Sequence, residues 1–179
     1  MAAAGLSLDN PVTGERIVFR QTGQDGSGSV VEFDHYMPAA KGPTFPEHVQ
    51  LNQEERFEVV SGTARYRLNR SDHQAQAGET VVVPPGAIHT NCWNAGPGEL
   101  HLRHSFHPGL GSDVFFEMMF SLAKAGKTNA KGDVNLLQLA VIGSEIESQT
   151  FNAAIPIGLQ RLGLPVLAAL GRMFGYRAR

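Results

Sequence analysis

The sequence predicts a mainly β protein, a sandwich or barrel of short strands followed by about three α-helices. Between residues 16 and 108, short segments of alternating apolar and polar residues are separated by turns rich in glycine and proline, as is typical of an antiparallel sandwich or barrel. After Pro108 the apolar residues change to helical spacing. With 179 residues, 42% of them hydrophobic, the chain is long enough for one core with an appendage.

Seven segments between residues 16 and 108 have the composition of strands. The glycine-rich run 23–28 and Gly62 have the composition of turns between them. In the segment after Gly62, Ala64, Tyr66 and Leu68 alternate with arginines, so the apolar side chains face the core and the arginines face solvent. The predicted strands are 16–21, 30–37, 56–61, 63–69, 80–83, 88–93 and 100–107.

Three later segments, 112–125, 134–147 and 156–174, have the spacing of helices. Pro165 lies inside the third and is expected to kink or break it. Their apolar faces need a surface to cover them. We therefore expect an N-terminal arm (1–15), a barrel (16–108) and a helical extension (109–179) packed on the barrel or on a partner subunit.

Charge and composition argue against several classes of function. The net charge of −2 and the pI near 6.4 give no electrostatic reason to expect nucleic acid or an anionic membrane as a partner. No signal peptide and no apolar stretch long enough to span a bilayer is recognisable, so we expect a cytoplasmic protein. Cys92 is the single cysteine, which rules out an intrachain disulfide, and we expect it to be a small buried apolar residue.

Four polar residues have the types that hold a metal ion. His48, Gln50 and Glu55 lie close together in sequence, and His89 comes from a later strand. His48 and Gln50 are two positions apart, so on a strand their side chains point to the same side. A corner at Asn52-Gln53 is expected to return the chain antiparallel and bring Glu55 alongside them. Two imidazoles, an amide and a carboxylate suit one divalent ion with open positions.

The spacing of these residues resembles the two motifs of the cupin superfamily, G-x5-H-x-H-x3-4-E-x6-G and G-x5-P-x-G-x2-H-x3-N. The resemblance covers roughly residues 16–108 and implies a jelly-roll barrel, the cupin double-stranded β-helix, with a metal ion in its mouth. The matching positions are Gly42-x5-His48-x-Gln50-x4-Glu55-x6-Gly62 and Gly78-x5-Pro84-x-Gly86-x2-His89.

The sequence departs from the family pattern at two positions. Gln50 stands where the family usually has its second histidine; its amide oxygen either binds the metal directly or orients a water molecule. An amide is a weaker donor than imidazole for transition metals. Asn94 comes one residue later than the pattern has it, so we expect a bulge in the strand after His89.

The resemblance implies two classes of function. The first is a metal-dependent enzyme, a dioxygenase or an isomerase, that acts on a small organic molecule with one divalent ion (Fe²⁺, Zn²⁺, Mn²⁺ or Ni²⁺). The second is a non-catalytic cupin that binds a small molecule for sensing or storage, with a weakened or absent metal site. The motifs single out no catalytic acid or base. The resemblance also implies frequent homodimers.

A second group of histidines, at positions 101, 104 and 107, lies on one predicted strand. At the rise of a strand, His101 and His107 are about 20 Å apart, and His104 points to the opposite face. The three therefore cannot share one ion. Because His104 lies on the apolar face with Leu102 and Phe106, we expect a hydrogen-bonded core histidine there, within reach of the barrel cavity.

Overall fold

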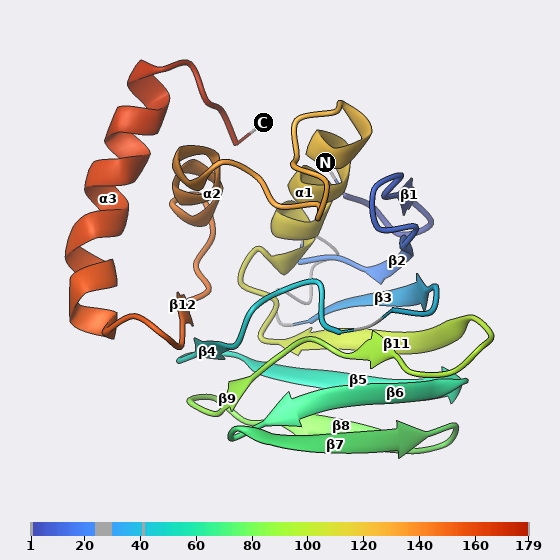
Figure 1. Cartoon of the computed structure of the whole chain (residues 1–179). Helices are drawn as coiled ribbons and strands as arrows, with labels where there is room; N and C mark the ends of the chain where they lie inside the picture. Colours follow the sequence, from blue (N-terminus) through green and yellow to red (C-terminus); the bar gives the residue numbers. More distant parts are fainter. Residues whose placement is uncertain (1, 24–29, 41, 179) are drawn as a thin grey trace.

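A computed structural model of the chain describes residues 2–23, 30–40 and 42–178 (Figure 1). The strands form two antiparallel sheets of six strands each. In spatial order, sheet A contains β1 (Ser7–Asp9), β2 (Arg16–Gln21), β3 (Val31–Met37), β11 (Leu100–His107), β5 (Glu54–Ser61) and β8 (Thr80–Val83). Sheet B contains β10 (Trp93–Asn94), β6 (Thr63–Leu68), β9 (Ile88–His89), β4 (His48–Gln50) and β12 (Thr150–Asn152), with β7 (Ser71–Gln76) paired to β6.

The main core lies between the two sheets. Phe57 and Leu102 of sheet A and Ala64 of sheet B are almost completely buried in one apolar cluster, whereas Arg65, next in sequence, is exposed. Each fully buried phenylalanine or leucine side chain contributes roughly 1.5–3 kcal/mol through removal from water. The predicted mainly β fold with three helices is confirmed, and so is the inward orientation of Ala64.

A second core lies where helix α1 (Ser112–Lys124) covers the rest of sheet A. Phe19, Phe33 and Phe106 from the strands pack against Phe120 of α1, with Phe116 partly buried at the edge of the cluster. Helix α1 lies over β2 and β3 in Figure 1. The inner face of sheet A is therefore covered by sheet B over one part and by α1 over the other.

The turn between β5 and β6 carries the chain from sheet A to sheet B. Gly62 occupies this turn at φ 91°, a conformation that other residues rarely adopt. A Cβ atom at this position would lie 3.1 Å from the carbonyl oxygen of Glu99. Both the conformation and the space require glycine here, as the sequence predicts.

Helices α2 (Leu136–Gly143) and α3 (Ile157–Met173) pack against each other beside the sheets. The contact is close at Gly171, where a Cβ would lie 2.8 Å from the carbonyl oxygen of Leu137. Helix α3 lies on the far side of α2 from α1 (Figure 1). Several of its large apolar side chains are exposed, namely Leu159, Leu162, Val166, Leu170 and Met173.

The helices differ from the sequence prediction in two ways. Helix α3 continues through Pro165, so a break at this residue is wrong. Proline removes one backbone hydrogen bond, and because Pro165 is on the exposed face, water can reach the carbonyl that loses its partner. Helix α2 is shorter than the predicted 134–147, because the Asn135 side chain accepts a hydrogen bond from Leu137 N at its start and Ser144 Oγ bonds to Val141 O at its end.

The strands also differ from the prediction. The segment 88–93 forms two short strands, β9 and β10, instead of one strand with a bulge. The interruption follows from Thr90 and Asn91, whose side chains bond to the backbone of Arg67 and Phe45. Strand β7 was not predicted, because its sequence SDHQAQ lacks apolar alternation. The predicted turn 23–28 falls almost wholly outside the described residues.

The expected arm and helical extension both contribute strands. From the arm, β1 pairs with β2 at the edge of sheet A. From the extension, β12 pairs with β4, with Thr150 opposite Gln50. The side chain of Asn52 strengthens this connection by bonding to Glu147 O and Gln149 N. The last third of the chain therefore completes the sheet that carries His48 and Gln50.

Candidate metal centre

In the part of the chain that the structure describes, one group of side chains can hold a metal ion: His48, Glu55 and His89. One ligand atom from each lies within 4.8 Å of the others, and all three residues are buried. His48 of β4 and His89 of β9 are paired in sheet B, with ring centroids 4.2 Å apart. The sequence prediction names these same three residues.

Glu55 reaches the group by a route that differs from the expected one. Strand β5 belongs to sheet A, so Glu55 approaches the histidines from the opposite sheet and not by pairing with β4. The corner after β4 is held by Gln53, which is buried. Its amide nitrogen donates to Pro108 O and Gly109 O at 2.7 and 2.8 Å, which connects the corner to the start of α1.

The backbone sets the orientation of both histidine rings. Nδ1 of His48 lies 3.0 Å from Pro46 O, and Nδ1 of His89 lies 3.0 Å from Ala87 O. Because a carbonyl oxygen only accepts, Nδ1–H donates in both rings and the two Nε2 atoms face Glu55. Histidines that bind metal ions commonly donate their second nitrogen to a carbonyl in this way.

The charges of the group are strongly coupled. Burial favours a neutral Glu55, but hydrogen bonds from His104 and His89 outweigh burial and lower the pKa of the Glu55 carboxyl far below its usual range. Burial likewise opposes charge on His89, yet the bond from its Nε2 to Glu55 Oε2 at 2.8 Å and the charge of Glu55 raise its pKa. Burial and the neighbouring His89 lower the pKa of His48 to about 4.

These residues fit a divalent ion. Nε2 of His89 and Nε2 of His48 lie 2.8 and 4.0 Å from Glu55 Oε2. Ligand atoms that share one ion at about 2.1 Å lie roughly 3–4 Å apart. Gln50 is a candidate for a fourth contact, because it lies two residues from His48 on β4 and its Oε1 is buried without a hydrogen-bond partner among the described residues. Such an unpaired oxygen costs about 1–3 kcal/mol unless a ligand meets it.

His104 contacts the group, although it lies outside both cupin motifs and the sequence analysis did not name it as a site residue. Its Nε2 lies 2.7 Å from Glu55 Oε1, and the residue is 2% exposed. The prediction of a hydrogen-bonded core histidine is correct, and so is its separation from His101, which lies on the opposite face bonded to Asp34. The alternation of β11 could locate His104 on the inner face, but not its partner on β5.

The remaining singled-out residues have structural roles. Cys92 is 1% exposed, and burial raises the pKa of its thiol well above the ordinary value, which agrees with a small buried apolar residue. The side chain of Asn94 donates to Met37 O and Gly98 O at 2.9 and 2.6 Å, so it holds a loop and does not contact the candidate ligands.

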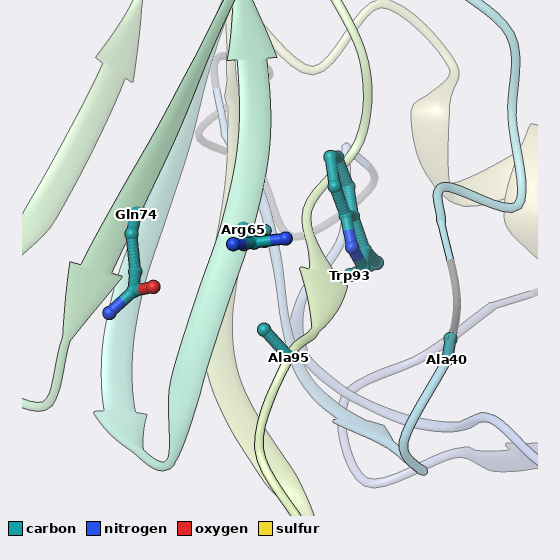
Figure 2. Close-up of a pocket in the computed structure, with 5 residues that line it drawn as sticks. All are labelled: Ala40, Arg65, Gln74, Trp93 and Ala95. Carbon is teal, nitrogen blue, oxygen red and sulfur yellow. The ribbon is translucent and has the colours of Figure 1, made fainter.

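Two surface hollows among the described residues lie away from this group. One, of about 360 Å³, lies on the outer face of sheet B, where Trp93, Arg65 and Gln74 follow one another across β10, β6 and β7 (Figure 2). The other, of about 530 Å³, lies between α2 and the residues that follow α3. Neither includes His48, Glu55 or His89, which are at most 6% exposed.

Comparison with known proteins defines the class of protein. Residues 35–109 match the family model described as "Cupin domain", and this segment contains the whole candidate metal group. This segment is therefore assigned to the cupin superfamily. No curated protein matches the chain. Among the described residues, no helix is long and apolar enough to cross a bilayer.

Several solved structures are similar at low sequence identity. The cupin domain of Cnp3 from Schizosaccharomyces pombe is 15% identical, with 52% of this chain and 61% of that chain covered and a TM-score of 0.45. A predicted oxalate decarboxylase from Thermotoga maritima is 14% identical, with 52% and 80% covered and a TM-score of 0.47. A putative sugar phosphate isomerase from Acidithiobacillus ferrooxidans is 19% identical, with 54% and 61% covered and a TM-score of 0.44. These similarities assign no activity to this chain.

Proposed function

We propose that the protein binds one divalent metal ion through His48, Glu55 and His89, with Gln50 as a fourth contact, and acts on a small organic molecule as a dioxygenase or an isomerase. The observation that carries the proposal is the arrangement of two histidines whose Nδ1 atoms donate to the backbone, so that both Nε2 atoms face one buried carboxylate. A bound ion supplies either a site for dioxygen and substrate or polarisation of a carbonyl group.

In the metal-free protein a proton occupies part of this arrangement. Nδ1 of His89 donates to Ala87 O, so its Nε2 needs a second proton to bond with Glu55 at 2.8 Å. The raised pKa of His89 agrees with this protonated state. Binding of an ion by Glu55 and His89 displaces the proton, so metal affinity should rise with pH.

The surroundings of the group favour an uncharged substrate. Every described arginine and lysine is at least partly exposed, whereas aromatic rings lie directly beside the candidate ligands. The ring of Phe45 lies 5.3 Å from that of His48, and Phe115 of α1 lies 6.0 Å from Phe45. A carboxylate or phosphate of a substrate that lies out of reach of the ion would find no buried arginine or lysine there among the described residues. An aromatic or diketone compound suits these surroundings better.

Metal analysis of the untagged protein tests the proposal. Elemental analysis should find about one divalent ion per chain, and His48→Ala and His89→Ala should lose it. His101→Ala is the matched control, since its ring bonds to Asp34 on the opposite face of β11. A correctly folded wild-type protein that stays metal-free after reconstitution with Fe²⁺, Zn²⁺, Mn²⁺ and Ni²⁺ would refute the proposal.

The second candidate function is a non-catalytic cupin that stores or senses a small molecule. It is favoured by the burial of the candidate ligands, which are at most 6% exposed. Oxygen uptake by the metal-loaded protein, measured on a panel of aromatic and diketone compounds, separates the two functions. Consumption of oxygen supports the dioxygenase. Tight binding of a compound that is recovered unchanged supports the binding protein.

A further inference from the structure

We propose that His104 is a positioning residue for the metal centre: it holds Oε1 of Glu55, so that Oε2 is left to face His48 and His89. The inference rests on the metal site proposed above and adds a residue that lies outside both cupin motifs. Oε1 lies 2.7 Å from Nε2 of His104, while Oε2 lies 2.8 Å from Nε2 of His89. The two oxygens of one carboxylate are thus divided between a supporting residue and the candidate ligands.

The ring of His104 is held by aromatic packing. Its centroid lies 4.8 Å from that of Phe33, 4.4 Å from that of Phe57 and 4.6 Å from that of Phe106. Phe116 of α1 approaches edge-on at 5.8 Å, so rings from both sheet A and α1 surround it. Rotation of the imidazole would have to displace these rings. This aromatic cage of four phenylalanines therefore holds the imidazole in the orientation in which Nε2 points toward Glu55.

The hydrogen-bond pattern defines the tautomer of His104. Nδ1 is buried and has no hydrogen-bond partner among the described residues, while Nε2 faces an ionised carboxylate. The proton therefore lies on Nε2, which donates to Glu55 Oε1. His48 and His89 have the opposite arrangement, because their Nδ1 atoms donate to backbone carbonyls. The three imidazoles consequently divide into two that face the ion and one that supports its carboxylate.

An apolar residue at position 104 would suit the local packing better than histidine. The neighbouring inward residues Leu102 and Phe106 are apolar, and the unpaired Nδ1 costs about 1–3 kcal/mol in this surrounding. Among the described residues, Glu55 is the one hydrogen-bond partner of the ring. Because Gln50 is a weaker ligand than histidine, a well-placed Glu55 contributes a larger share of the binding of the ion.

The experiment compares two amide variants that differ in reach. In His104→Gln the amide nitrogen falls close to the position of Nε2 and can still donate to Glu55, whereas in His104→Asn it stops near the position of Nδ1. His104→Phe fills the aromatic cage without a donor. His101→Asn is the matched control, because His101 also bonds to a carboxylate but on the other face of β11. Zn²⁺ affinity by chelator competition and the visible absorption spectrum of the Co²⁺ form are measured for each full-length variant.

We expect His104→Asn and His104→Phe to bind Zn²⁺ about 10–100-fold more weakly with an altered Co²⁺ spectrum, and His104→Gln and His101→Asn to stay within about threefold of wild type with its spectrum. Wild-type affinity in folded His104→Asn or His104→Phe would overturn the inference. So would a His104→Gln that binds as weakly as His104→Phe, since the imidazole itself would then matter. If wild type binds no metal, the proposed function fails together with the inference; if wild type binds and His104→Phe binds equally, the inference alone fails.

Discussion

The substitution Gln50→His tests whether residue 50 contacts the ion. Gln50 is 6% exposed and lies two residues from His48 on β4, so its side chain points to the same side. The two side chains are similar in size, and β12 supports the strand in both forms. If the amide oxygen is a ligand, histidine restores the usual cupin set, and the ion gains a better donor.

The expected change in metal affinity follows from the donor strength at position 50 and from the burial of Gln50. An imidazole in place of an amide oxygen should tighten Zn²⁺ or Ni²⁺ binding roughly tenfold or more, on the order of 1.4 kcal/mol. In the metal-free protein, Oε1 of Gln50 has no partner among the described residues, which costs about 1–3 kcal/mol. An ion that meets this oxygen recovers that free energy. Gln50→Leu, which offers no donor, should therefore bind more weakly than wild type by about tenfold or more.

Chelator competition at constant pH measures both variants against wild type, with thermal melting of the metal-free forms as the check on folding. The predicted order of affinity is Gln50→His, then wild type, then Gln50→Leu. Equal affinities in three well-folded proteins would show that residue 50 does not touch the metal. The hypothesis that Gln50 orients a water molecule predicts a smaller loss in Gln50→Leu than direct ligation does.

Two further predictions concern stability and assembly. Burial and neighbouring histidines lower the pKa of His35 to about 3 and that of His48 to about 4, so between pH 6.5 and 4 the unfolded chain binds more protons and stability falls as pH falls. Each histidine changes the free energy of unfolding by up to about 1.4 kcal/mol per pH unit. The free energy of unfolding of metal-free His35→Phe, measured with urea, should therefore change less between pH 7 and pH 5 than that of wild type. An equal change in the two proteins would contradict this prediction. The exposed apolar face of α3, on which Leu162 is 76% exposed, should join two copies of the chain, so light scattering should find a dimer that Leu162→Glu dissociates. Removal of residues 109–179 should cause aggregation; a monomeric wild type, or a monodisperse truncated protein with native-like melting, would contradict the expected assembly.

The strand pattern and the ligand spacing were predictable because both follow local rules. Short apolar segments bounded by turn residues located β2, β8 and β11 at their observed bounds. His48 and His89 were identified by their residue type and by the resemblance of their spacing to the two cupin motifs. These features depend on neighbours in sequence, which a sequence displays directly.

The parts that sequence did not predict depend on contacts between distant segments. The sequence names Glu55 as a candidate ligand and the structure brings it beside His48 and His89, but its approach from sheet A follows from how the two sheets face each other. The partner of His104 lies 49 positions earlier, and no local rule connects the two residues. Strand β12 has only three residues, and it is a strand because it pairs with the edge of β4. Tertiary pairing decided each of these cases.

The pairing of β12 with β4 has a consequence for the order in which the site is completed during synthesis. Thr150 pairs with Gln50, one hundred residues earlier in the chain, so the ribosome must translate one hundred further residues after β4 before this pairing is available. Until then β4 has an unprotected edge, whose backbone groups invite pairing with other chains. Strand β4, which carries His48 and Gln50, therefore gains its β12 partner late. Stable binding of the metal ion should follow the synthesis of the last third of the chain.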